Sequence, residues 1–407
     1  MRGELGQVVV VMDKAVEIFA QRRRMIQLLG FSALSVALPF RLRAADRRAV
    51  SPTVPGVALG SPDQNGLRLL PGYQSRVIAR SGSRPAPGST YVWHDAPDGG
   101  ATLATADGGW IYVSNSEVGR QGGGVGAVRF TADGSIIDAY SILTGTSRNC
   151  AGNMTPWGSY LSCEETVNGQ VWECDPLGKQ PAQVRPLLGR FSHESVVVEP
   201  QSRQLYLTED HPDGRLYRFT AVRNDDMGRP DLSAGLLEVA QLIRNENDDT
   251  LVWHIVPDPL ARRRPTRAQV RQSTAFNGGE GICFQHGLIC FATKGDDRIW
   301  TLDPVSRKIS ILYDDDFYRS PILRGVDNVI PTPAGDLLVS EDGDDLQLVT
   351  LMLSGRVQPF LQLMGHEQSE LTGLAFSPDG RRLYVSSQRG STGHSSGGTV
   401  FEVSRSG

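Results

Sequence analysis

The sequence predicts an all-β protein folded as a six-bladed β-propeller. Three observations support this: a recurring strand–turn–strand phrase, a spacing of about 45 residues between most copies, and a composition rich in turn formers. The 407 residues include 45 glycines and 24 prolines, whereas aromatic residues make up only 7%. Repeats of this length with three or four short strands each are typical of propeller blades.

The repeated phrase has a strand, a turn rich in Pro, Asp and Gly, a second strand ending in Ser-Glu or a similar pair, a polar loop and a third strand. It occurs at 100–134, 154–175, 193–219, 280–303, 326–352 and 371–404. A longer gap between the third and fourth copies contains the polar stretch 224–272, which we interpret as the end of a blade plus an insertion on one face. A long open β-solenoid or two β-sandwiches are the alternatives.

The N-terminus predicts an export signal of the twin-arginine type over residues 1–45. Arg22, Arg23 and Arg24 precede an apolar run at 28–40, which is shorter than the roughly 20 residues that a membrane-spanning helix needs. A basic region, a short apolar core and small residues after it indicate a signal peptide, and paired arginines favour the twin-arginine route. An amphipathic surface helix is the alternative. We therefore expect a linker over 46–70, a propeller over 71–407, and a periplasmic or secreted protein without stable membrane insertion.

Charge and cysteine content exclude several classes of protein. The formal net charge of −4 is mild and argues against a nucleic-acid partner, which would favour a basic face. The chain has five cysteines, so at least one lacks an intramolecular partner. Cys283 and Cys290 flank a predicted hairpin turn and form either a cross-strand disulfide or two buried thiols. The sequence has no CxxC pair and no Walker loop, and we expect a monomer.

Acidic residues recur at the starts of first strands and at the ends of second strands. Because the second strand returns antiparallel to the first, these places meet at one end of the channel. Strand starts carry Glu194, Glu280 and Asp327, and strand ends carry Glu117, Glu164, Glu165, Glu209, Asp210, Glu341 and Asp342. Such a cluster predicts a site for Ca²⁺ or Mn²⁺. Cys163 directly precedes one of these acids, and its thiolate would favour a softer ion such as iron.

Cationic and amide residues replace the acid in two of the repeats. Lys294 ends the second strand of the fourth copy, and Gln388, followed by Arg389, ends that of the sixth. Cations at the rim of a metal cluster are suited to holding phosphate oxygens, although each could also be an ordinary surface charge. His193 and Asn328 lie beside predicted ligands and could bind metal, support a ligand or be structural.

The segment TPWGSYLSCEET at 155–166 resembles the hallmark segment of the PhoX-type alkaline phosphatase family. The phrases FSHESV, EGI, VDN and SEDG follow in the order of that family, at 191–196, 280–282, 326–328 and 340–343, and the resemblance covers about 72–404. It implies an exported six-bladed propeller whose mixed cluster of Fe³⁺ and Ca²⁺ hydrolyses phosphate monoesters. By this resemblance Cys163 would bind iron, and the carboxylate ligands would be Glu164, Glu194, Glu280, Asp327 and Glu341, with Glu165, Asn328 and Asp342 as further matches.

The predicted activity is metal-assisted hydrolysis of a small phosphorylated substrate, in which Arg389 and Lys294 clamp phosphate oxygens as catalytic residues. Two rival functions remain open. A calcium-dependent propeller lactonase or esterase would need Ca²⁺ alone and no cysteine ligand. A non-catalytic binding propeller would keep the fold with an incomplete metal set. The metal content of the purified protein separates the three.

Overall fold

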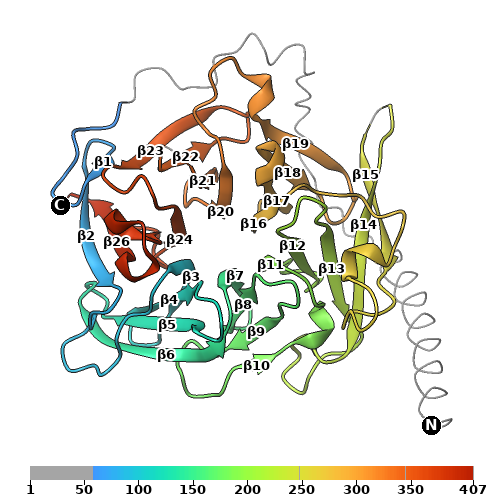
Figure 1. The fold of residues 1–407 in the computed structure, drawn as a ribbon, viewed down its shortest axis with the longest axis horizontal. Coiled ribbons are helices and arrows are strands. Elements are labelled where there is room, and N and C mark those ends of the chain that lie inside the picture. The colour runs from blue at the N-terminus through green and yellow to red at the C-terminus, as the bar shows by residue number, and fades with distance from the viewer. Residues whose placement is uncertain (1–57, 247, 344, 407) are drawn as a thin grey trace. The chain divides into compact units, whose positions relative to one another are not determined.

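The computed structural model describes residues 58–406 except 247 and 344, and this part of the chain is almost entirely β-structure. Its strands form six antiparallel sheets arranged around a central axis (Figure 1). The prediction of an all-β, six-bladed propeller is therefore confirmed. The predicted export signal and residues 46–57 lie outside the described residues. None of the helices among the described residues is long and apolar enough to cross a bilayer.

The first three blades follow one another along the chain. Blade 1 contains β3 (Pro97–Ala104), β4 (Trp110–Ser116), β5 (Gly123–Phe130) and β6 (Ile136–Thr146). Blade 2 contains β7 (Asn149–Met154), β8 (Tyr160–Glu164), β9 (Val171–Cys174) and β10 (Gln183–Val184). Blade 3 contains β11 (His193–Val198), β12 (Leu205–Glu209), β13 (Leu216–Ala221), β14 (Gly235–Ile243) and β15 (Thr250–Ile255).

The last three blades complete the ring. Blade 4 contains β16 (Gly279–Gln285), β17 (Leu288–Thr293), β18 (Arg298–Leu302) and β19 (Ile309–Asp314). Blade 5 contains β20 (Val326–Pro331), β21 (Leu337–Glu341), β22 (Gln347–Leu351), β23 (Val357–Leu363) and β1 (Leu67–Leu69). Blade 6 contains β24 (Leu371–Phe376), β25 (Arg382–Ser387), β26 (Thr399–Arg405) and β2 (Tyr73–Arg80). Short 3-10 helices in the connections are η1 (Pro186–Leu188), η2 (Thr266–Ala268), η3 (Lys294–Asp296), η4 (Asp315–Phe317), η5 (Gly390–Thr392) and η6 (Ser395–Gly397).

The ring is closed by strands from the N-terminal part of the described chain. β2 pairs antiparallel with β26, with Tyr73 opposite Arg405, so blade 6 joins the two ends of the described chain. β1 pairs with β23 as the outermost strand of blade 5. The predicted linker over 46–70 is therefore wrong at its C-terminal end, because residues 67–69 form a strand.

The hydrophobic core lies between neighbouring blades. Because side chains alternate between the two faces of a strand, each inner strand presents an apolar face to the blade on either side. Tyr112 of blade 1 and Tyr384 of blade 6, for example, stack with their ring centroids 4.7 Å apart. Cys283 and Cys290 lie directly opposite each other on β16 and β17, and both are free thiols buried between blades 4 and 5. A side chain inside a regular strand therefore points toward a neighbouring blade and not toward the axis.

Candidate metal centre

One backbone hydrogen bond recurs in all six blades and closes the hairpin of the two innermost strands at the same end. The residue that follows the second strand donates its N–H to a carbonyl at or just before the start of the first strand. The bonds run from Glu117 to Ala96, Glu165 to Arg148, Asp210 to Ser192, Lys294 to Gly278, Asp342 to Gly325 and Gln388 to Glu370, with N–O distances between 2.8 and 3.1 Å. These six donor residues form what we call the second ring.

A matching first ring consists of the residues two positions after each carbonyl acceptor. They are Asp98, Cys150, Glu194, Glu280, Asp327 and Thr372. In every blade the strand register shifts at or directly after this residue, which marks a β-bulge. Bulges interrupt the alternation of a strand and redirect a side chain. The bulges therefore account for how five of these side chains can leave the blade faces and turn toward the axis, whereas the hydroxyl of Thr372 donates to the carbonyl of Pro97 in blade 1 at 2.9 Å.

The two rings bring acidic groups from different blades into contact. Carboxylate oxygens of Glu194, Glu280 and Asp327 lie within 4.8 Å of one another, and so do ligand atoms of Cys150, Glu165 and Glu194. Both groups contain Glu194, so five side chains from blades 2, 3, 4 and 5 form one connected cluster. Asp98, Glu117 and Glu370 form a second group of the same kind from blades 1 and 6.

Burial makes this concentration of charge costly. Glu194 is 1% exposed and Glu280 is 2% exposed, and burial, reinforced by neighbouring carboxylates, raises the pKa of Glu194 well above its usual range. Burial also raises the pKa of Glu165 and of Glu370 to about 8 and that of Asp327 to about 6. Closely spaced buried carboxylates cannot all ionise without a compensating cation.

Two cationic side chains offset part of this charge. Lys294 Nζ lies 2.9 Å from Oε1 of Glu280 and 3.2 Å from Oδ2 of Asp342. Burial opposes the charge on Lys294, but the adjacent carboxylates outweigh it and hold the pKa of Lys294 above its usual value. Arg389 Nη2 lies 2.7 Å from Oε1 of Glu370. Both predicted clamp residues therefore lie at the cluster, and both are partly exposed.

Gln388 joins the two acids of blade 1 to blade 6. Its amide nitrogen donates to Oδ2 of Asp98 at 2.5 Å and to Oε2 of Glu117 at 2.8 Å. An amide that donates to both carboxylates holds the two side chains next to each other, while Oδ1 of Asp98 accepts the backbone N–H of Gly99 at 2.6 Å and Oε1 of Glu117 accepts from Arg148 at 3.4 Å. The replacement of an acid by Gln in the sixth repeat therefore organises the cluster.

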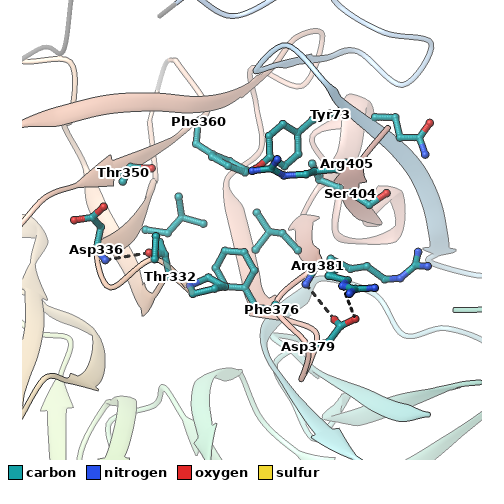
Figure 2. A pocket seen from close by; sticks show the side chains of 18 of the residues that line it. Tyr73, Thr332, Asp336, Thr350, Phe360, Phe376, Asp379, Arg381, Ser404 and Arg405 are labelled. Carbon is teal, nitrogen blue, oxygen red and sulfur yellow. Dashed lines mark hydrogen bonds and ion pairs between the residues drawn. The ribbon is translucent and has the colours of Figure 1, made fainter. Parts of the chain in front are cut away.

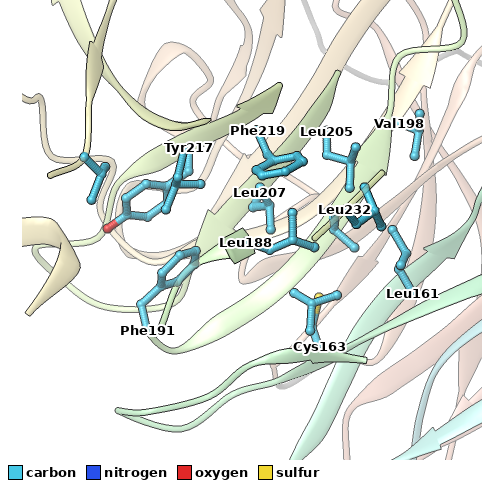
Figure 3. Close-up of a cluster of buried hydrophobic side chains, with 14 of the residues drawn as sticks. Leu161, Cys163, Leu188, Phe191, Val198, Leu205, Leu207, Tyr217, Phe219 and Leu232 are labelled. Carbon is cyan, nitrogen blue, oxygen red and sulfur yellow. The ribbon is translucent and has the colours of Figure 1, made fainter. Parts of the chain in front are cut away.

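The prediction that Cys163 lies among the carboxylates is wrong. Cys163 is inside the regular strand β8, opposite Val171, and its side chain is fully buried in the apolar core between blades 2 and 3 (Figure 3). Cys150 takes the place at the axis because it lies at the bulge of β7. Its thiol donates to Oε1 of Glu194, with Sγ 3.2 Å from the oxygen.

Glu164 and Glu341 are also absent from the groups of close ligand atoms found among the described residues. Glu164 accepts backbone N–H groups of Ser147 at 3.0 Å and of Gln170 at 3.2 Å. The Glu341 carboxylate likewise accepts the backbone N–H groups of Arg324 at 3.0 Å and of Gln347 at 3.3 Å. Each carboxylate thus braces the loops beside it, and the residue that follows it, Glu165 or Asp342, belongs to the second ring.

Sequence reasoning placed part of the cluster and missed the rest. Among the predicted ligands, Glu194, Glu280 and Asp327 lie in the first ring and Asp342 in the second. The missed residues are Cys150, Asp98 and Glu370. A detectable signal existed for Cys150, because it precedes Glu165 by the same one-hairpin interval that separates Asp327 from Asp342.

A separate cavity of about 820 Å³ lies at the ends of the inner strands that are opposite to the two rings (Figure 2). It is bordered by the β20–β21 turn, with Thr332 and Asp336, and by the β24–β25 turn, with Asp379 and Arg381. These turns are at the ends of the hairpins opposite to the two rings. The cavity contains none of the predicted site residues.

Fold and cluster together define a six-bladed propeller with a buried acidic site on its axis. The chain belongs to the alkaline phosphatase PhoX family, whose model matches residues 88–295 and 304–390. Among solved structures, PhoX of Pseudomonas fluorescens in complex with vanadate, a transition state analogue, is similar with a TM-score of 0.70 and 17% identity, over 86% of this chain and 98% of that one. A gluconolactonase from Xanthomonas campestris gives a TM-score of 0.47 and 12% identity, over 86% and 95% of the two chains. No curated protein has a significant sequence match to this chain.

Proposed function

We propose that this protein is an exported, metal-dependent phosphatase that hydrolyses phosphate monoesters at iron and calcium ions held on the propeller axis. The observation that carries the proposal is the connected cluster of Cys150, Glu165, Glu194, Glu280 and Asp327, buried at one end of the axis. Membership of the alkaline phosphatase PhoX family supports the reaction class.

The donor atoms of the cluster fit two kinds of cation. The all-oxygen groups, Glu194 with Glu280 and Asp327, and Asp98 with Glu117, suit Ca²⁺, which prefers carboxylate oxygens. The thiol of Cys150 adds a soft ligand, which favours a transition metal such as iron on that side of the cluster. When bound, such cations act as Lewis acids toward the phosphate ester and neutralise its charge.

The protein's own cations would position the phosphate. Lys294 belongs to the second ring and Arg389 directly follows Gln388 of that ring. Both are partly exposed, with 35% and 36% of the side chain accessible. From there the ammonium and guanidinium groups can donate hydrogen bonds to non-bridging phosphate oxygens, where negative charge develops in the transition state. Their ion pairs with Glu280 and Glu370 fix both cations in place before substrate arrives.

An assay combined with metal analysis tests this function. We expect protein loaded with iron and calcium to hydrolyse p-nitrophenyl phosphate and to contain both elements. Cys150→Ala should lose iron and activity together. Activity no higher than that of Cys150→Ala at any metal loading would overturn the proposal, and hydrolysis of a lactone with calcium alone would replace it with the lactonase function.

Export is a separate part of the proposal and rests on the sequence of residues 22–45. We expect the protein from its native host to lack this segment and to be found in the periplasm or medium. Intact-mass measurement of that protein tests the expectation, because retention of residues 1–45 in a cytoplasmic fraction would contradict it.

A further inference from the structure

The segment between β15 and β16 is unusually basic for this protein. Residues 257–272 contain five arginines and a single acid, Asp258, whereas the whole chain has a formal charge of −4. Arg262 shows 72% of its side chain to solvent, and its nearest ion-pair contact, with Asp258, is 3.9 Å long. A positive segment on an acidic protein attracts anions and opposes the repulsion that the carboxylate cluster would exert on them.

Hydrogen bonds fix this segment between blade 2 and the axial end of blade 3. The backbone N–H of Arg190 donates to the carbonyl of Pro259 at 2.9 Å, and the hydroxyl of Thr266 donates to the carbonyl of Arg190 at 2.6 Å. On the other side, Arg267 Nη1 donates to Oε1 of Glu209 at 3.0 Å. Glu209 directly precedes Asp210 of the second ring, so the segment lies beside the axial end of blade 3.

A cavity of about 510 Å³ lies where the segment meets blade 2, and its polar lining consists of donors that suit an anion. Its walls include the side chains of Asn168, Gln170, Arg190 and Arg262. The Nε of Arg190 is shielded from solvent and has no hydrogen-bond partner among the described residues. Buried donors are nearly always paired in folded proteins, so an acceptor is expected here. A guanidinium group combined with amides matches the oxygens of a phosphate group.

The cavity and the axial cluster share a loop. Gln170 lines the cavity, and its backbone N–H donates to Oε2 of Glu164 at 3.2 Å. The same β8–β9 loop begins with Glu165, which belongs to the cluster around Cys150. A single substrate molecule could therefore span the β8–β9 loop and contact the cavity and the axial cluster at the same time.

We propose that the cavity around Arg190 is a second anion subsite, which binds a further phosphate group of a substrate whose first phosphate is cleaved at the axial cluster. The proposal rests on the phosphatase function and narrows its substrate class to small molecules with two or more phosphate groups. Arg190 is the central donor of this subsite, and Arg262 contributes charge at its rim.

A comparison of fructose 1,6-bisphosphate with fructose 6-phosphate tests the subsite. In the metal-loaded protein we expect Arg190→Gln to lower the ratio of kcat/KM for the bisphosphate over the monophosphate by roughly tenfold or more, since the substitution removes a charged hydrogen-bond donor to the second phosphate. Arg263→Gln is the matched control, because Arg263 belongs to the same basic run but does not line the cavity. An unchanged ratio in Arg190→Gln would overturn the subsite.

A binding measurement decides the question even if the protein hydrolyses neither sugar phosphate. Calorimetric titration of chelator-treated protein with fructose 1,6-bisphosphate should give a dissociation constant roughly tenfold weaker for Arg190→Gln than for Arg263→Gln. Equal constants would contradict the subsite, whereas absence of p-nitrophenyl phosphate hydrolysis alone would contradict only the phosphatase function. Unchanged melting temperatures would establish that both variants are folded.

Discussion

The thiol of Cys150 donates a hydrogen bond to Oε1 of Glu194, with the sulfur 3.2 Å from the oxygen. The two residues come from different blades, and each lies at a bulge near the start of the innermost strand. Regular strands direct side chains toward neighbouring blades, whereas these bulges allow one residue in each of blades 1 to 5 to face the axis. Most of the axial site is therefore composed of residues at the bulges and residues that follow the second strands, and Glu370, directly before β24, adds a further carboxylate.

This contact predicts that Cys150 on β7 and Cys163 on β8, which both lie at the open end of the β7–β8 hairpin, have different roles. Cys150→Ala should abolish iron binding and lower kcat by at least 10²-fold, because it removes the one sulfur ligand in the cluster. Cys163→Ala should keep its metal and its activity and lower the free energy of unfolding by about 1 kcal/mol, because it removes a buried atom from the core between blades 2 and 3. Elemental analysis, p-nitrophenyl phosphate assays and urea unfolding measure these effects.

Loss of iron in Cys163→Ala, with metal retained in Cys150→Ala, would contradict this assignment. Both variants remove a single sulfur from neighbouring strands of one blade. Each is therefore the matched control of the other.

The sequence predicted the architecture of the fold because repeats can be counted, and an axial acidic site follows from ring closure. It could not assign the individual ligands. Cys150 lies shortly before the PhoX-like segment at 155–166 and Cys163 lies inside it, and only the bulge at β7 decides which one faces the axis. Likewise Glu164 and Glu165 are adjacent acids, and the register of β8 decides that the first braces a loop and the second joins the cluster. A bulge adds one residue to one strand of a pair, and period-2 patterns do not locate it.

The loop-bracing role of Glu341 predicts a stability effect without loss of metal. In Glu341→Gln the amide group faces one of the two backbone N–H donors, so one hydrogen bond is lost, a donor is left unpaired, and the free energy of unfolding should fall by about 1–3 kcal/mol. Asp342→Asn, one residue later, should instead weaken metal binding and activity with a smaller effect on unfolding. Denaturant unfolding and metal titration of the two variants separate loop bracing by Glu341 from metal binding by Asp342. Loss of metal in Glu341→Gln would show instead that Glu341 is a metal ligand.

The buried carboxylates predict that the protein depends on cations for stability. Removal of metal with a chelator should lower the melting temperature, and added Ca²⁺ should restore it, because a ligand at a hundred times its dissociation constant adds about 2.7 kcal/mol to the free energy of unfolding. Glu194→Gln removes one buried charge and should reduce this dependence on calcium. Asp107→Asn changes an exposed acid that pairs with Arg129 and should leave it unchanged. An identical melting temperature with and without chelator would argue against metal at the axis.

The position of Lys294 between Glu280 and Asp342 predicts that its charge serves both the cluster and the substrate. Lys294→Met should lower kcat by about 10²- to 10³-fold, the effect of removing one preorganised donor to a transition-state oxygen, and Lys294→Arg should recover part of that loss because the charge is retained. Lys308→Met is the matched control, since Lys308 pairs with Asp248 on the surface with 58% of its side chain exposed. If Lys294→Met lowered only the melting temperature and left kcat at the level of Lys308→Met, the lysine would neutralise the carboxylates without contacting phosphate, and the clamp would consist of Arg389 alone.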